Sequence, residues 1–322
     1  MSKLTIANKK QDLRWAIPVA DEVIGMRTLI ANLYFIGRPG SSTDWVLVDA
    51  GMGNCADAIE RAAAEHFGAG ARPKAIILTH GHFDHVGGLP ELAARWNVPV
   101  YAHPLELPFL TGRASYPPGD PGVGGGGMAW LSFLYPRQPI DLQDHIQTLP
   151  EDGAIPFLPD WKWIFTPGHT PGHISLFREG DGVLIAGDAF VTTKQESAVS
   201  AMSQKPQEVR RPPAYFTIDW QAAAQSVRRL AALRPETVAT GHGLPMQGAE
   251  MRRQLDALAR DFEEIAIPTG GRYANEPAIS DETGVISVPP PTFQGQVPKV
   301  VAGLALAGAA FGIWSLLKDK RD

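Results

Sequence analysis

Three histidines and one aspartate stand within six residues of this chain, namely His80, His82, Asp84 and His85. The chain has 9 histidines in 322 residues, so a chance grouping of three is improbable and a set of solvated turn residues is the weaker interpretation. Imidazole and carboxylate groups in such a cluster suit zinc or another borderline divalent metal. The aspartate adds the carboxylate that a second metal or an attacking water molecule needs.

The element before this cluster has to aim its side chains. Residues 74–78 form an apolar run with β-branched side chains after Pro73, which predicts a buried strand. The histidines then lie on a turn at the end of that strand. A turn can direct neighbouring side chains to one point, whereas strand side chains alternate between the two faces of a sheet.

Three further candidate ligands follow apolar runs elsewhere in the chain. His169 comes after residues 161–165, Asp188 after 182–186 and His242 after 237–240, each beside a glycine. Glycine lets a backbone and a ligand approach closely because it has no side chain. The recurrence of this arrangement predicts one shared site at the ends of several strands.

The rest of the pattern alternates strands with helices, which indicates an α/β fold. Strands are predicted within residues 23–36 and at 45–49, 74–78, 98–102, 161–165, 174–177, 182–186 and 237–240, and helices at 56–66, from about 91, at 220–233 and at 248–265. Asp219 is a suitable N-cap for the helix that begins at Trp220.

Residues 111–144 interrupt this alternation with a glycine run at 124–127, followed by Trp130, Phe133 and Tyr135. The glycine run is either a flexible linker or part of a loop over a pocket, since long loops within compact domains are often lids. On the second interpretation the three aromatic side chains are candidate walls of a substrate pocket.

Composition and charge are those of an ordinary globular protein, with 20% charged and 44% hydrophobic residues. A net charge of −5 gives no reason to expect nucleic acid as a partner. The single cysteine, Cys55, excludes an intrachain disulfide, and the first residues lack the apolar core of a secretory signal. We therefore expect a cytoplasmic protein with a small-molecule substrate.

Residues 300–317 form an uncharged run of 18 residues, bounded by basic side chains on both sides. As a helix this run is about 27 Å long, near the lower limit for spanning a bilayer. Three interpretations stay open: a membrane anchor, a helix that docks on this protein, on a second copy or on a partner, and a helix that lies on a membrane surface.

The motif His-x-His-x-Asp-His, the later Gly-His, Gly-Asp and Gly-His pairs, and Asp49-Ala50-Gly51 upstream together resemble the metallo-β-lactamase fold superfamily over roughly residues 20–265. The resemblance implies an αββα sandwich of two mixed β-sheets flanked by helices. We accordingly expect a catalytic domain over residues 1–266, a Pro- and Gly-rich extended tail over 267–298 and an apolar helix over 299–322.

The resemblance also implies a centre with two metal ions, zinc being expected and iron or manganese being alternatives. The first ion would be held by His80, His82 and His169, the second by Asp84, His85 and His242, and Asp188 would bridge them. Two such ions activate a water molecule and polarise a substrate oxygen. Asp84 is also the candidate to pass a proton to the leaving group, while Asp49 and His173 are expected to support the ligands.

Hydrolysis of a small ester, lactone or thioester is the expected reaction, because the chain is similar to the lactonase-like and glyoxalase II-like members of the superfamily. Lactonase-like members carry a tyrosine three residues after the bridging aspartate, where this chain has Val191. Tyr215 is a candidate to replace that tyrosine in space. The alternatives are an iron-dependent oxidoreductase or dioxygenase on the same fold, and a metal-binding protein without catalysis.

Overall fold

The computed structural model describes residues 15–142 and 145–292. The apolar helix expected over 299–322 lies outside these residues, as does the end of the expected tail. Within the described ranges, no helix has both the length and the apolar character needed to cross a bilayer.

The first sheet contains seven strands in the same order in space as in the sequence. They are β1 (Ala16–Ala20), β2 (Val23–Thr28), β3 (Ala31–Gly37), β4 (Trp45–Val48), β5 (Ala75–Ile77), β6 (Val100–Ala102) and β7 (Ile146–Thr148). The strands from β1 to β4 pair antiparallel, and those from β4 to β7 pair parallel. The sheet is therefore mixed, and β1 is a strand that the sequence pattern did not predict.

The second sheet contains six strands in the order β13-β12-β11-β10-β9-β8. They are β8 (Ala154–Ile155), β9 (Leu158–Phe165), β10 (Ile174–Arg178), β11 (Val183–Ile185), β12 (Thr237–Ala239) and β13 (Met246–Gln247). Only the pair β11 and β12 is parallel, so this sheet is mixed as well.

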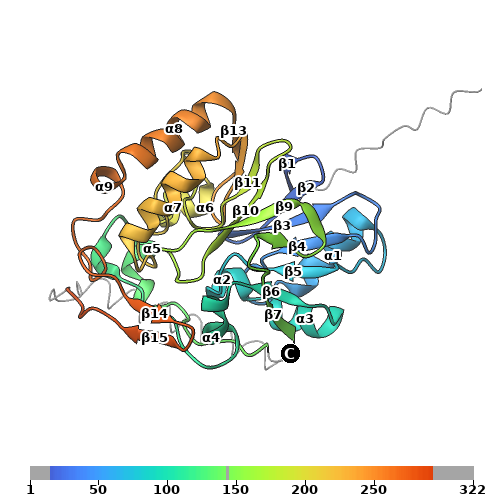
Figure 1. Ribbon diagram of the computed structural model, residues 1–322, viewed down its shortest axis with the longest axis horizontal. Coiled ribbons are helices and arrows are strands. Elements are labelled where there is room, and N and C mark those ends of the chain that lie inside the picture. The colour runs from blue at the N-terminus through green and yellow to red at the C-terminus, as the bar shows by residue number, and fades with distance from the viewer. Residues whose placement is uncertain (1–14, 143–144, 293–322) are drawn as a thin grey trace, which may run out of the picture.

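The two sheets pack face to face, with helices on their outer faces (Figure 1). Side chains of both sheets, among them Val46, Ile77, Trp161 and Leu176, share one buried cluster between them. Helices α1 (Ala56–Phe67) and α3 (Leu89–Trp96) bury their apolar sides in a cluster with Leu47 and Ile76 of the first sheet. Helices α7 (Trp220–Ala232) and α8 (Gly248–Arg260) do the same over Leu184 and Val238 of the second. The predicted α/β fold, with two mixed sheets flanked by helices, is confirmed.

The segment between β6 and β7 contains several short helical turns. They are η1 (Pro104–Glu106), α4 (Leu107–Leu110), η2 (Pro121–Val123), α5 (Gly127–Trp130) and η3 (Ser132–Leu134). The amide of Met128 donates to the carbonyl of Glu196 (3.1 Å), just before α6 (Ala198–Ser203). This contact fastens the end of the glycine run to a loop of the second sheet.

The described part of the stretch 267–298 differs from the extended tail that its composition predicts. It folds back as a hairpin of β14 (Ile279–Asp281) and β15 (Gly284–Ser287) after a buried Tyr273, whose hydroxyl donates to the carbonyl of Pro118 (2.7 Å). Tyr273 and Ala278 pack in the cluster under α7 and α8, so apolar burial fixes a segment that is rich in loop-forming residues. The predicted helix 248–265 is also divided at Asp261, where α8 ends and α9 (Phe262–Ile265) begins.

The cap of α7 gives a stability prediction. Asp219 accepts a hydrogen bond from the amide of Ala222 (2.9 Å), as an N-cap should. We expect Asp219→Ala to lower the free energy of unfolding by about 1 kcal/mol, because that amide loses its partner. Urea denaturation measures the effect. Asp219→Asn, which keeps the acceptor, is the control and should stay close to wild type; an equal loss in both variants would show that the cap is not the cause.

Candidate metal centre

All seven candidate ligands lie at the carboxyl ends of strands and are buried. His80 and His82 follow β5, and Asp84 and His85 lie on the single-turn helix α2 (Phe83–Val86) that comes next. His169 lies between β9 and β10, Asp188 follows β11, and His242 follows β12. These strand ends belong to both sheets and lie together, so candidate ligands that are far apart in the sequence come close in space. The structure thus brings together every side chain that the sequence pattern singled out as a candidate ligand.

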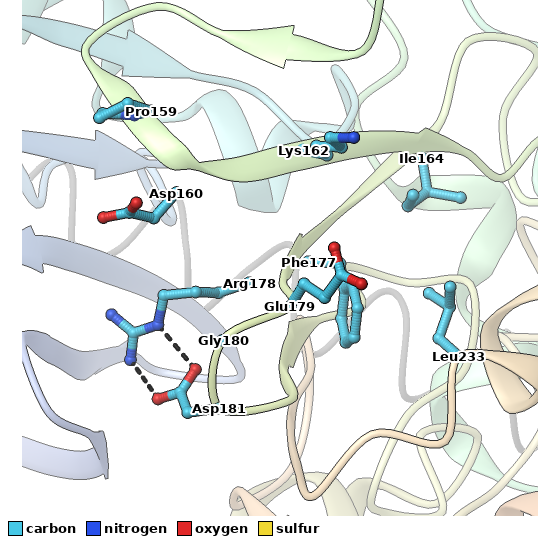
Figure 2. A pocket seen from close by; sticks show the side chains of 10 residues that line it. All are labelled: Pro159, Asp160, Lys162, Ile164, Phe177, Arg178, Glu179, Gly180, Asp181 and Leu233. Atoms are coloured by element: carbon cyan, nitrogen blue, oxygen red, sulfur yellow. Dashed lines mark hydrogen bonds and ion pairs between the residues drawn. The ribbon is translucent and has the colours of Figure 1, made fainter.

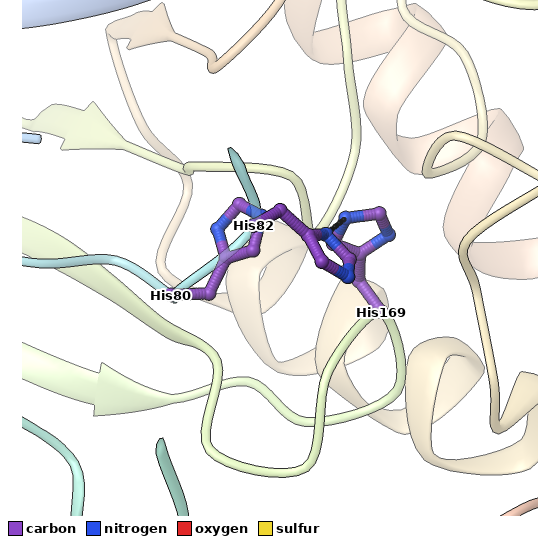
Figure 3. A group of neighbouring side chains, drawn as sticks. All are labelled: His80, His82 and His169. Atoms are coloured by element: carbon purple, nitrogen blue, oxygen red, sulfur yellow. Dashed lines mark hydrogen bonds between the residues drawn. The ribbon is translucent and has the colours of Figure 1, made fainter. Parts of the chain in front are cut away.

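One group consists of His80, His82 and His169, whose nearest ligand atoms all lie within 4.8 Å of one another. Figure 3 shows the contact between two of these rings, in which His82 Nδ1 lies 3.0 Å from His169 Nε2. The rings of His80 and His169 are close to perpendicular, with centroids 4.9 Å apart. Three imidazole nitrogens that converge in this way can hold one divalent ion.

A second group consists of Asp84, His85 and His242, again with ligand atoms within 4.8 Å of one another. His242 Nε2 lies 3.6 Å from Asp84 Oδ2. Asp188 stands between the two groups: its Oδ2 lies 3.1 Å from His242 Nε2 and 3.4 Å from His169 Nε2. One carboxylate therefore faces ligands of both groups.

The ligand atoms fit metal ions better than they fit one another. His80 Nε2, His85 Nε2 and Asp188 Oδ1 are buried without a hydrogen-bond partner among the described residues. An unpaired buried polar atom costs about 1–3 kcal/mol, so three at one place need an explanation. The group offers nitrogen and oxygen atoms and no thiolate, which suits zinc and leaves iron and manganese open.

The histidines of the site differ in the direction in which their pKa values are shifted. Burial lowers the pKa of His82 to about 3 and the pKa values of His80 and His169 well below the usual range, so these rings are neutral, as metal ligands must be. Burial opposes a charge on His85 too, but the carboxylates of Asp188 and Asp49 outweigh it and raise the pKa of His85 to about 10. A metal ion at His85 would have to displace that proton.

Asp49 fixes the orientation of His85. Its Oδ2 accepts hydrogen bonds from His85 Nδ1 and from the hydroxyl of Thr79, and its Oδ1 accepts one from the Thr79 amide. Each of the three distances is 2.8 Å. The bond to Nδ1 leaves His85 Nε2 facing Asp188, at 3.7 Å. Asp49 itself has a left-handed backbone (φ 61°), a conformation that Asp and Asn tolerate better than most residues.

His173 has both ring nitrogens occupied by the protein. Its Nε2 accepts from the amide of Asp188 (2.9 Å), so its Nδ1 carries the proton and donates to the hydroxyl of Thr166 (2.9 Å). Gly187 lies against this ring, because a Cβ there would be 2.6 Å from His173 Nε2. His173 is thereby placed to orient the backbone of Asp188 rather than to bind an ion.

The first sheet holds the loop that carries His242. His242 Nδ1 donates to the carbonyl of Ile30 (2.8 Å), and Asn32 Nδ2 donates to the carbonyls of Thr240 (2.9 Å) and Gly243 (2.6 Å). The hydroxyl of Tyr34 also donates to the Thr240 carbonyl (2.6 Å). Sequence reasoning missed these supports, although an amide side chain within the apolar run 31–36 is a signal that could have found Asn32.

An aromatic cluster borders the candidate ligands on one side. Phe216 lies 4.7 Å from the ring of His82, and Tyr135 contacts Phe83, Tyr215 and Phe216 with ring centroids 5.8 Å apart in each case. Burial, and next the charge of Asp84, raise the pKa of Tyr135 to about 12 and that of Tyr215 well above its usual value. Both tyrosines therefore lie close enough to Asp84 to sense its charge.

Trp130 and Phe133 do not join this cluster. Their side chains are 53% and 48% exposed, and they belong to none of the buried apolar clusters. Of the four side chains that the sequence suggested for a pocket, the structure places Tyr135 and Tyr215 beside the candidate ligands and Trp130 and Phe133 at the surface. Phe216 and Phe83 take the places beside the ligands.

A cavity of about 660 Å³ lies elsewhere, along β9, β10 and the turn that follows β10 (Figure 2). Its lining includes Lys162, Arg178 and Asp181, of which Arg178 and Asp181 form an ion pair (2.7 Å). None of the seven candidate ligands lines it, so its volume has no bearing on the chemistry of the metal centre.

Comparison with known proteins shows the family of this chain. A sequence model of the metallo-beta-lactamase superfamily matches residues 26–242. The chain is 51% identical over 246 residues to the probable metallo-hydrolase YflN of Bacillus subtilis (strain 168), covering 76% of this chain and 93% of that protein. It is 32% identical over 200 residues to the probable metallo-hydrolase YybB of the same organism, covering 62% and 76%.

Among solved structures, a beta-lactamase domain protein from Burkholderia ambifaria superimposes with a TM-score of 0.52 at 22% identity, covering 77% of this chain and 73% of that one. At this identity the likeness concerns the fold alone.

The bond between Asp49 and His85 gives a prediction about metal affinity. Asp49→Asn keeps the size and the left-handed backbone but removes the charge that holds His85. We expect zinc to bind about 10–100-fold more weakly at the Asp84, His85 and His242 group, as is usual when a ligand loses its supporting carboxylate. Titration against a chromophoric chelator measures this. Unchanged affinity for every bound ion would rule out the supporting role of Asp49.

Proposed function

Because the chain belongs to the metallo-beta-lactamase superfamily, we propose that it is a hydrolase that uses two zinc ions to cleave a small ester, lactone or thioester. One observation supports this most directly: two groups of three buried ligands share an edge of the sheets, and Asp188 faces both. In this proposal His80, His82 and His169 would hold one ion, Asp84, His85 and His242 would hold the other, and Asp188, which faces both groups, would serve both. Two divalent ions so bound would lower the pKa of a water molecule and polarise a substrate oxygen.

Asp84 is the proposed proton carrier. Its Oδ2 faces His242, and its Oδ1 is the atom that we propose takes a proton from the attacking water and gives it to the leaving group. The side chain is buried at the start of α2, so packing on this short helix holds it in place. Asp49 and His173 act indirectly, because they orient His85 and the backbone of Asp188.

The aromatic cluster supports a substrate with an apolar part. Phe216 lies against the ring of His82, and Tyr135 and Met128 pack against the apolar cluster that contains Phe216. Tyr215 is the side chain that we propose donates a hydrogen bond to the substrate carbonyl oxygen, since Val191 cannot. Its hydroxyl would then stabilise the charge that develops on that oxygen.

Metal dependence is the first test of this proposal. The purified protein should contain two zinc ions per chain, lose its activity towards lactones or thioesters on chelation and regain it with zinc. Asp84→Ala should lower kcat at least about 10²–10⁴-fold, because it removes the proton carrier and also a proposed ligand of the second ion. Asp160→Ala, an exposed aspartate of β9, serves as the control and should leave kcat unchanged.

The same measurements separate the other functions. Iron in place of zinc, with a visible absorption band and no hydrolysis, would favour an oxidoreductase. Bound zinc without turnover of any lactone, thioester or phosphodiester would favour a metal-binding protein. Either result would contradict the proposed hydrolase.

Tyr215→Phe tests the role of the hydroxyl alone, because the ring and its packing are kept. If the hydroxyl contacts the substrate oxygen, kcat should fall about 10²–10³-fold, as for the loss of one donor to a developing oxyanion, while zinc content stays at the wild-type level. Tyr135→Phe, in the same aromatic cluster, is the matched comparison. Equal, small effects of both substitutions would assign Tyr215 to packing.

A further inference from the structure

Glu106 is a buried carboxylate to which the proposed mechanism gives no role. It closes the turn η1 after β6, and none of its surface is exposed. Its Oε2 accepts from the amide of Gly81 (2.9 Å) and from the hydroxyl of Tyr116. Its Oε1 accepts from the hydroxyl of Thr170 (2.7 Å) and the amide of Gly172 (2.8 Å). Each carboxylate oxygen therefore has two donors, which matches the acceptor capacity of the group.

Three of these donors, Gly81, Thr170 and Gly172, belong to the two loops that supply the first group of ligands. Gly81 stands between His80 and His82, and Thr170 follows His169 directly. The bonded residues are separated from Glu106 by 25 positions at Gly81 and by 64 and 66 positions at Thr170 and Gly172. A single side chain thus joins two loops from different sheets at the point where their histidines converge.

Tyr116 strengthens the same junction from the side of His82. Its hydroxyl also accepts from the amide of Gly81 (3.0 Å), and its ring lies 4.6 Å from the ring of His82 and stacks on Phe109 at 3.9 Å. A Cβ at Gly81 would lie 2.5 Å from this hydroxyl. The approach of the loop to Glu106 and Tyr116 therefore requires glycine at this position.

The second group of ligands has separate supports. His85 is held by Asp49, and His242 is held by the carbonyl of Ile30. Within the described part of the chain, the side-chain hydrogen bonds of Glu106 do not reach Asp84, His85 or His242. Loss of the Glu106 bonds should therefore affect one group of ligands and spare the other.

We propose that Glu106 is a positioning residue that sets the separation of His80, His82 and His169, so that the first metal position depends on it and the second does not. This inference rests on the proposed two-metal function. It concerns binding of the ion at one position and is independent of the substrate.

Glu106→Gln tests the proposal with a side chain of the same shape. In either orientation of the amide, its NH₂ group faces one backbone N–H, that of Gly81 or that of Gly172, so one loop loses its bond. We expect zinc affinity at the first position to fall about 10–100-fold, as measured by chelator competition. In crystals with limiting zinc, anomalous scattering should disappear between His80, His82 and His169 and persist between Asp84, His85 and His242.

The matched control is Glu196→Gln. Glu196 is also a buried carboxylate, 3% exposed, and accepts from Arg211 (3.1 Å) and from the amide of Ala214 (3.3 Å). It should keep both zinc positions filled. Should Glu106→Gln fail to fold, Thr170→Val removes one donor of the junction with little change in shape and should weaken the same position to a lesser degree.

Two results would overturn the role of Glu106: equal weakening at both positions, or unchanged affinity at both in folded Glu106→Gln and Thr170→Val. The wild type separates this inference from the proposed function. A wild type with a single zinc contradicts the two-metal mechanism, while the effect of Glu106→Gln on affinity still decides the role of Glu106 if that zinc lies between His80, His82 and His169. A single zinc elsewhere, or none, overturns both.

Discussion

The burial of unpaired ligand atoms is the constraint on which the site depends. The buried atoms His80 Nε2, His85 Nε2 and Asp188 Oδ1 have no hydrogen-bond partner among the described residues. Side chains with unpaired buried atoms would shift to form hydrogen bonds with one another unless their other polar groups were already bonded. Those groups are bonded here, because Asp49 holds His85 and His173 holds the backbone of Asp188. The apolar clusters on both faces of each sheet offset the free-energy cost of burying these unpaired atoms. The atoms therefore stay available to bind metal.

The relation between the two sheets is as important as either sheet alone. Each candidate metal position takes ligands from both, His80 with His169 in one case and His85 with His242 in the other. The packed layer between the sheets sets their spacing, and Asn32 and Tyr34 of β3 bond to the loop that follows β12. A change in sheet packing would therefore alter both positions, even where no ligand is touched.

The sequence predicted the layers and the candidate ligands because their signals are local: an apolar run, then a glycine and a polar side chain. Glu106 gave no such signal, since its donors lie 10–66 residues away and a Pro-Leu-Glu turn has no motif. Trp130 and Phe133 were suggested for the pocket because they are aromatic and near a glycine run, but composition does not tell which side of a loop faces inward. The hairpin at 279–287 was missed because Pro and Gly dominate around it, while Tyr273 and Ala278 fix it through tertiary packing.

The order of the strands in the first sheet has a consequence for synthesis on the ribosome. All seven strands of that sheet are made by Thr148, before His169, Asp188 and His242 have been translated. Domains generally fold as units, and the inner face of the first sheet shares its core with the second. Until the second sheet has been made, the nascent chain would carry His80, His82, Asp84 and His85 without the other candidate ligands. The motif that is translated early meets the other candidate ligands only when the second sheet packs against the first.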